Sequence, residues 1–481
     1  MFRTLLRRQL IDDIFTYRFL TSLVSTLAAV IIFSLVFTGH FRDLQGVYSR
    51  ASTQNDHNLQ VFAKSPSKSL GDAEQLLRFK PKPELFIADG YEDDLPQGFY
   101  FRPREHALQV LGPREEAAAG RLSANITVSK EERLTDVLSY SPDLMFVVQF
   151  FLSFFALVLA FDAITGEKQR GTLRLVYSNP AKRASFIAVK YVSALVTMGI
   201  ALILGLLMSA LLLDLLSPVP PSLSTMASLG LFFLVCLLYL SLFILLGMAC
   251  SVASHSSKNS LVLCLLVWAF LVVILPRSIG MFLTSKHYDV PAAEEIKQMA
   301  EKAQWDTSNR LENQLPAEYR ANWEKYKLSE KILRVYSEGY KARQDVLDFY
   351  LRKKLGAVSE VRKANFISPA SLFECAAASV SGTGLYHFEN LWTQARRYEV
   401  DFSTFVRNQN SLLDKGAYFY LDDNTISDKP LEFNAIPKFE DKLPPSGERL
   451  RDALPYLGLL GLYNLFLFAF VFYKFQTYDV R

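Results

Sequence analysis

Two glycines in the loop before the third apolar stretch have the spacing of a phosphate-binding loop. Gly166 and Gly171 are five residues apart, and such a loop continues with Lys and then Ser or Thr to hold the β/γ-phosphates and Mg²⁺. Thr172 and Leu173 stand in those two places, so no side chain would neutralise the phosphates. The spacing therefore does not predict a nucleotide site.

Other catalytic signatures are missing from the sequence. Gly382-Thr-Gly384 begins like a dinucleotide fingerprint, but His387 takes the place of the third glycine and no clear strand-helix unit surrounds it. The sequence has no HExxH, no GxSxG and no paired CxxC, and its six histidines are scattered. We expect neither enzymatic activity nor a metal site nor a resident cofactor in this chain.

The loop itself, residues 162–190, is basic. Asn179-Pro180 divides it into two short stretches that favour helix, 172–176 and 184–189, because Pro disfavours helix in the residue before it. Such a helix-turn-helix would present a rigid knob to a partner. Alternatively, its bases would hold it against anionic lipid, at about 1 kcal/mol each, and the two roles are compatible. The bases are Lys168, Arg170, Arg174, Lys182, Arg183 and Lys190.

Long apolar stretches flank this loop and recur along the chain. Half of the 481 residues are apolar and 21% are charged, and six charge-free intervals reach the roughly 20 residues that span a bilayer. This predicts a mainly α, six-span polytopic membrane protein. The net charge of +4 is too small to indicate nucleic-acid binding. The spans are assigned to residues 19–41, 143–161, 191–214, 223–250, 259–276 and 453–473.

Basic residues in the short connections indicate the orientation. The loop 162–190, Lys258 and the tail 474–481 fall on one side of the predicted bilayer, whereas the loop between spans 3 and 4 has no charge. By the positive-inside rule, the basic side and both termini are cytoplasmic. Residues 1–18 repeat apolar side chains at three- and four-residue steps, which predicts an amphipathic helix on the cytoplasmic membrane surface.

Two large segments then lie outside, residues 42–142 and 277–452. In the first, alternating stretches at 84–88, 98–101 and 125–128 predict short strands in a small mixed α/β domain. In the second, residues 292–365 have few Gly or Pro, which predicts two or three long helices in a larger helical domain. The apolar run 366–385 is expected to dip to the membrane interface.

Span 3 has a face of small residues. Ala201, Gly205 and Ser209 recur every four residues, which would let another helix approach closely. Packing within one chain and a seam between two copies in a dimer are both compatible with this face. The spans have no acid or base near their middle, which favours an energy source outside the membrane domain.

The basic loop resembles that of the type-2 permease family of ABC transporters (ABC-2). Members commonly show a Glu, a Gly-Thr-Leu four residues later, Ser-x-Pro-x-x-Arg and a Lys at the start of span 3. Insertions between spans 1 and 2 and between spans 5 and 6 are similar to a bacterial subfamily with large extracytoplasmic domains. The matching positions are Glu167, Gly171, Thr172, Leu173, Ser178, Pro180, Arg183 and Lys190, with Arg174 in the same loop.

The resemblance implies a permease subunit of an ABC exporter in the bacterial cytoplasmic (inner) membrane. Its partners would be the lipid bilayer, a second permease, identical or related, and two ATPase subunits that bind ATP and Mg²⁺. Each ATPase would dock on a loop like 162–190, in which Glu167 either pairs with a base or caps a helix opening at Thr172. The alternative is an ABC-like complex that transmits force or signal to a periplasmic or envelope partner without moving a solute. Its motivation is the outside segments, which make up more than half of the chain.

Overall fold

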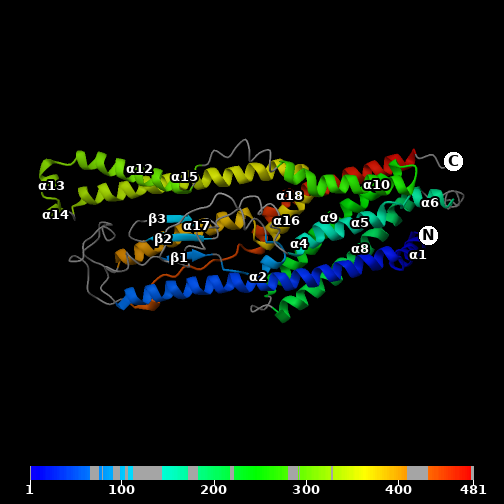
Figure 1. Cartoon of the computed structure of the whole chain (residues 1–481), viewed down its shortest axis with the longest axis horizontal. Coiled ribbons are helices and arrows are strands. Elements are labelled where there is room, and N and C mark those ends of the chain that lie inside the picture. Colours follow the sequence, from blue (N-terminus) through cyan, green and yellow to red (C-terminus); the bar gives the residue numbers. More distant parts are fainter. Residues whose placement is uncertain are drawn as a thin grey trace.

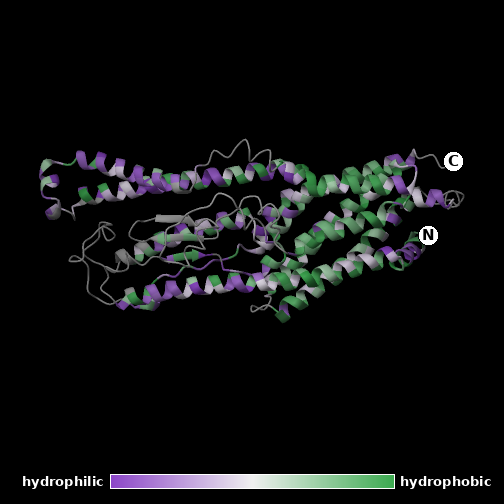
Figure 2. Ribbon diagram, viewed as in Figure 1, coloured by the Kyte–Doolittle hydropathy of each residue, from purple (hydrophilic) through white to green (hydrophobic). Residues whose placement is uncertain are grey.

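The computed structural model describes residues 2–64, 75–78, 80–89, 98–102, 107–111, 143–171, 183–216, 222–279, 291, 293–326, 329–408 and 432–477. The molecule is elongated, and most of its helices run close to its long axis (Figure 1). Apolar residues fill one half and polar residues predominate in the other (Figure 2). We call the apolar half, with the six spans, α1 and α16, the membrane domain. The polar domain comprises α2 beyond Phe41, β1–β3, α12–α15, α17 and residues 432–445.

Six helical segments of the described residues are long and apolar enough to cross a membrane, which confirms the mainly α, six-span prediction. A helix satisfies its own backbone hydrogen bonds, and lipid offers none in exchange. The spans lie in α2 (Tyr17–Lys64), in α4 (Leu144–Phe146) with η6 (Val147–Leu152) and α5 (Ser153–Ala160), in α8 (Arg183–Leu216), in α9 (Leu223–Ala253), in α10 (Ser257–Ala269) with η7 (Phe270–Ile274), and in α18 (Ser446–Gln476).

Helix α9 forms the centre of the membrane domain, because it packs against α5, α8, α10, α16 and α18. Its start is fixed by a capping box, in which the Ser222 hydroxyl accepts a hydrogen bond from the Thr225 amide and the Thr225 hydroxyl accepts one from the Ser222 amide. Phe232, Tyr239 and Phe243 are fully buried in this core.

Two spans contain π-helical turns, η6 in span 2 and η7 in span 5. Such turns break the regular backbone pattern, so their carbonyls need other donors. The Tyr239 hydroxyl donates to the Gln149 carbonyl of η6 at 3.3 Å, and the Ser368 hydroxyl donates to the Leu271 carbonyl of η7 at 2.9 Å. Side chains from elsewhere in the fold therefore hold both turns.

The helix of span 1 continues far beyond the apolar stretch. α2 has 48 residues, or about 72 Å at 1.5 Å per residue, whereas a bilayer core is about 30 Å thick. Its distal part supports the sheet, since the Asn55 side chain bonds both the amide and the carbonyl of Leu76, at 2.9 Å each. The first segment predicted to lie outside thus begins as a rigid extension of a span.

The sheet has three antiparallel strands in the order β1 (Gln75–Arg78), β2 (Gly98–Arg102) and β3 (Ala107–Leu111). In the register of the sheet, Leu77 of β1 lies opposite Phe99 of β2, and Phe99 lies opposite Val110 of β3. The strand predicted at 98–101 is part of β2. The strand predicted at 84–88 is wrong, because Pro83 starts a 3₁₀ turn there, η2 (Pro83–Phe86). The strand predicted at 125–128 lies outside the described residues.

A helical hairpin extends the polar domain away from the spans (Figure 1). Its arms are α12 (Ala293–Asn313) and α15 (Glu330–Ala364), joined by α13 (Ala317–Ala321) and α14 (Trp323–Tyr326), so the helices predicted in 292–365 are present. The arms approach closely at Gly339, where a Cβ would lie 2.2 Å from the Ser308 hydroxyl. A small apolar cluster around Leu315, Ile332 and Val335 closes the tip.

After α15 the chain returns into the membrane domain. The turn η8 (Asn365–Ile367) and helix α16 (Pro369–Ser381) follow, and α16 shares one apolar core with the spans. Phe373 of α16 stacks on Tyr239 of α9, with ring centroids 4.2 Å apart. The apolar run predicted to dip to the membrane interface is therefore built into the core, and α17 (Leu385–Asn408) then leads back into the polar domain.

Candidate functional site

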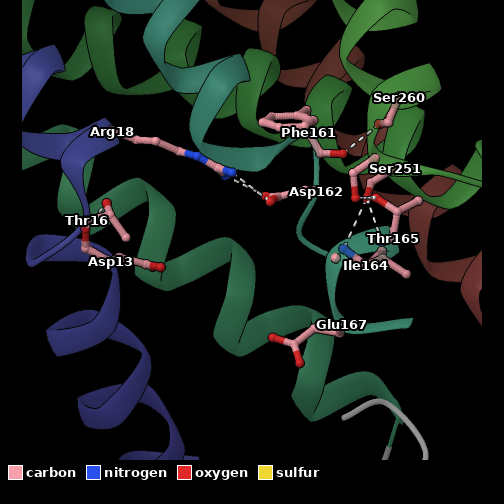
Figure 3. A network of polar contacts seen from close by, with 12 residues as sticks. Asp13, Thr16, Arg18, Phe161, Asp162, Ile164, Thr165, Glu167, Ser251 and Ser260 are labelled. Carbon is pink, nitrogen blue, oxygen red and sulfur yellow. Dashed lines mark hydrogen bonds and ion pairs between the residues drawn. The ribbon is translucent and has the colours of Figure 1, made fainter. Parts of the chain in front are cut away.

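The chain turns sharply at the end of span 2, and we call residues 161–171 the elbow. It comprises a turn after α5 and the short helix α6 (Thr165–Gln169). The Ser251 hydroxyl of α9 accepts hydrogen bonds from the amides of Ile164 and Thr165, at 3.1 Å each, and the Ser260 hydroxyl of α10 donates to the Phe161 carbonyl at 2.6 Å (Figure 3). Spans 4 and 5 therefore hold the backbone of the elbow.

An ion pair ties the elbow to the beginning of span 1. The Arg18 guanidinium of α2 donates to both carboxylate oxygens of Asp162, at 2.8 and 2.9 Å (Figure 3). It also lies 4.8 Å from the centre of the Phe161 ring. A bidentate pair fixes the orientation of both side chains as well as their distance.

A second ion pair ties the elbow to span 3. The Lys190 ammonium of α8 lies 2.8 Å from the Glu167 carboxylate of α6, and both side chains are mostly buried. Of the two roles predicted for Glu167, the structure shows pairing with a base. Two elements separated by the loop 172–182 are thus joined directly.

Helix α1 (Phe2–Ile14) joins the same network. The Ser193 hydroxyl of α8 donates to Asp13 at 2.5 Å, and the Gln9 side chain donates to Asp13 at 2.7 Å. Burial raises the pKa of the Asp13 carboxyl, and these two hydrogen bonds oppose that rise. Within the stretch 1–18 predicted as one amphipathic helix, α1 ends at Ile14 and α2 begins at Tyr17, and α1 contacts the spans through Asp13 and Ile14.

A cleft of about 490 Å³ separates α1 and the start of α2 from the elbow. Its charged lining has both signs, and salt bridges pair two acids with two bases. Such a lining suits the mutual attachment of helices better than the capture of a small ion. The charged groups are Asp12, Asp13, Arg18, Asp162, Glu167, Arg170 and Lys190.

The elbow ends at Gly171, which has a φ of +71°. This left-handed conformation is strained for a residue with a side chain. Gly171 therefore allows the chain to leave α6 abruptly toward the loop 172–182. α8 begins at Arg183, so the stretch predicted to be helical at 184–189 is continuous with span 3.

The residues predicted from the sequence fall into two groups. Glu167, Gly171 and Lys190 lie in or beside the elbow, and Arg183 is the first residue of α8. Thr172, Leu173, Arg174, Ser178 and Pro180 lie outside the described residues.

Four residues of the site were not predicted from the sequence: Asp13, Arg18, Ser251 and Ser260. Arg18 and Asp13 carried a usable signal, because both are charged residues next to a span. Ser251 and Ser260 carried no such signal, since Ser is common inside membrane helices.

The small-residue face of span 3 is occupied within the same chain. Ala201 and Ser209 are fully buried, and a Cβ on Gly205 would lie 3.6 Å from Thr26 and 3.7 Å from Val30 of α2. Spans 1 and 3 therefore pack closely along this face.

Most of the chain matches a known protein family. A family model described as ABC-2 family transporter protein matches residues 16–393, which run from the turn before α2 into α17. A comparison with curated proteins found no match.

Proposed function

The chain belongs to the ABC-2 transporter family and is a membrane permease component of an ABC transporter, and we propose that the elbow receives the motion of a partner ATPase. The supporting observation is the direct attachment of the elbow to four other elements. Hydrogen bonds and ion pairs connect it to α2, α8, α9 and α10, and α1 joins through α8. A push on the loop 162–190 would therefore reach four spans at once.

In this proposal the chain hydrolyses no ATP itself. Two ATPase subunits hold ATP and Mg²⁺, and each docks on a loop 162–190 of one of two permeases, identical or related. The spans then rock and open a path at the interface of the permeases. The direction we propose is export from the cytoplasm across the bacterial inner membrane, with the elbow and both termini on the cytoplasmic side.

The Glu167–Lys190 pair allows a sharp test. Glu167→Lys or Lys190→Glu alone would place like charges in contact, whereas the double exchange restores an attraction. We expect each single variant to insert normally but to lose most stimulation of ATP hydrolysis in the complex with the co-purifying ATPase. The double exchange should recover a substantial part of it.

A charge reversal at an exposed pair in the polar domain provides the control. Lys438 and Asp56 are 2.9 Å apart and nearly half exposed, and Lys438→Glu should leave the stimulation unchanged. Full stimulation in both single variants at the elbow would refute its role in coupling.

A second function is favoured by the continuity of α2 and by the burial of α16 among the spans. Helices α2 and α16 both connect the polar domain rigidly to the membrane domain, so motion of the spans must move the polar domain. The complex would then transmit force to an envelope partner without moving a solute.

Truncation of the hairpin distinguishes the two functions. Residues 311–335 form the tip with its own apolar cluster, so a short Gly/Ser linker in their place should leave both arms in position. Export of a solute through the spans should survive this change. Loss of the physiological output with normal ATPase stimulation would favour force transmission.

A further inference from the structure

A second cavity lies where the polar domain meets the membrane domain, far from the elbow. Its volume is about 70 Å³, enough for a few water molecules or one small polar group. Its wall combines residues of α2, of the segment 78–89, of the turn between α16 and α17, and Leu443. Parts of the chain more than 300 residues apart thus enclose one space.

The turn between α16 and α17 has the sequence Ser381-Gly382-Thr383-Gly384. Gly382 has a φ of +73°, a conformation that favours glycine, and a Cβ there would lie 2.9 Å from the Leu443 side chain. The Thr383 hydroxyl donates to the Ala88 carbonyl at 2.7 Å and fixes the turn on the opposite wall. Helix α17, with 24 residues, begins directly after Gly384. The first amides of such a helix have no partner inside it and attract anions.

A buried hydroxyl beside this helix start has no hydrogen-bond partner among the described residues. Ser381 is fully buried and lines the cavity, and within the described part of the chain its Oγ makes no hydrogen bond. A buried hydroxyl without a partner costs free energy, so the site is incomplete as it stands. A ligand with acceptor oxygens would satisfy it.

The cavity wall carries charges of both signs. Arg78, Lys80 and Lys82 line it, and Arg78 is only 8% exposed. Two acids, Glu84 and Asp89, line it as well, and the Glu84 carboxylate accepts a hydrogen bond from the Thr225 hydroxyl of α9. The Lys82 ammonium is 2.8 Å from Asp441. With Lys82 neutralised by Asp441, the remaining charges of the wall balance, and the start of α17 adds the partial positive charge that favours an anion.

The position of the cavity relative to the bilayer indicates the source of such an anion. Leu44 and Tyr48 of α2 line it and lie three and seven residues beyond Phe41, where the charge-free stretch of span 1 ends. At 1.5 Å per residue this is roughly 5 to 10 Å beyond the hydrocarbon boundary, the level of lipid headgroups. Lipid phosphates and soluble phosphates both reach this level.

We propose that this junction cavity binds a phosphate group, held by the Ser381 hydroxyl, the first amides of α17 and the Arg78 guanidinium. The group belongs either to a phospholipid of the adjoining leaflet or to a soluble phosphate. This site is independent of the elbow and of ATPase docking. A bound phosphate would join α16, α17 and the segment 78–89 at the point where the two domains meet.

The test uses the purified full-length permease and two variants. Ser381→Ala removes one hydrogen bond to a charged ligand and should weaken binding of inorganic phosphate about tenfold. It should not lower thermal stability, because the hydroxyl makes no hydrogen bond with the described residues that could be lost. Arg78→Gln should weaken binding at least as much. If Arg78→Gln fails to fold, Lys80→Gln, at an exposed side chain of the wall, replaces it.

Ser379→Ala is the matched control. Ser379 lies on the same helix, but its hydroxyl donates to Asp452 at 2.5 Å. This variant should bind phosphate like the wild type.

Two measurements separate the sources of the phosphate. Native mass spectrometry after delipidation shows whether wild-type protein retains a phospholipid that Ser381→Ala loses, which assigns the site to lipid. Calorimetric binding of inorganic phosphate without a retained lipid, weakened by the same variant, assigns it to a soluble phosphate. If neither ligand binds, or if both variants bind as the wild type does, the proposal is wrong.

Discussion

At the residue scale, single serine hydroxyls hold the backbone of the elbow. Ser251 is fully buried, and its Oγ accepts from two amides, those of Ile164 and Thr165. Ser251→Ala would leave both amides without a partner, and each buried orphan costs about 1–3 kcal/mol. We expect a clear fall in melting temperature in detergent. Ser49→Ala, at an exposed serine of α2, should change it little, and equal melting temperatures for both variants would contradict this view of the elbow.

His387 predicts a pH dependence at the same scale. Burial lowers the pKa of its imidazole from 6.5 to about 4; the nearby Asp441 opposes this, and Lys82 and Arg449 add to it. The unfolded chain therefore takes up a proton at this residue between pH 6.5 and 4 while the folded chain does not. Stability is fully present above pH 6.5 and falls by roughly 3 kcal/mol as the pH drops to 4.

The measurement compares melting temperatures at pH 7 and pH 5. His387→Gln should lose less stability on acidification than the wild type does. His57→Gln, at an exposed histidine of α2, should keep the wild-type response. An unchanged response in His387→Gln would assign the acid sensitivity to other groups.

At the element scale, α2 is the longest single connection between the two domains. Gly46 lies inside it beyond the apolar stretch, and a Cβ there would meet nothing within 4 Å. Gly46→Ala should therefore stabilise the helix by about 0.5–1 kcal/mol, whereas Gly46→Pro should break it at a cost of about 3 kcal/mol.

These two variants test whether α2 transmits motion. Both should insert into the membrane, since the span lies before the substitution. Gly46→Pro should reduce the physiological output and Gly46→Ala should retain it. Normal output in Gly46→Pro would show that the polar domain does not depend on a continuous α2.

At the scale of the whole molecule, the elbow and the hairpin lie at opposite ends (Figure 1). In the orientation that we propose, the end with the elbow is cytoplasmic and the end with the hairpin is external. A cysteine at Ser337 of α15 should react with an impermeant thiol reagent added to intact cells, and one at Gln169 of α6 should not. The four native cysteines are buried and are replaced in this background. Labelling of the cysteine at Gln169, without labelling of the one at Ser337, would show that the orientation is the opposite of the one proposed.

The sequence by itself determined the six spans, the small face of span 3 and the presence of long helices in residues 292–365. These follow from local rules, because a charge-free run of about 20 residues can satisfy its backbone in lipid only as a helix. The resemblance in the basic loop also led to the ABC-2 family, to which the chain belongs.

Only the tertiary structure decided how these elements are joined. The pairs Arg18–Asp162 and Glu167–Lys190 and the bonds of Ser251 connect residues 23 to 144 positions apart, and no local pattern selects such partners. The strand predicted at 84–88 failed because Pro83 favours a 3₁₀ turn over the alternating pattern. The cavity at Ser381 depends on four distant segments packing together. Folding brings them into contact, so its presence could not be deduced from spacing in the sequence.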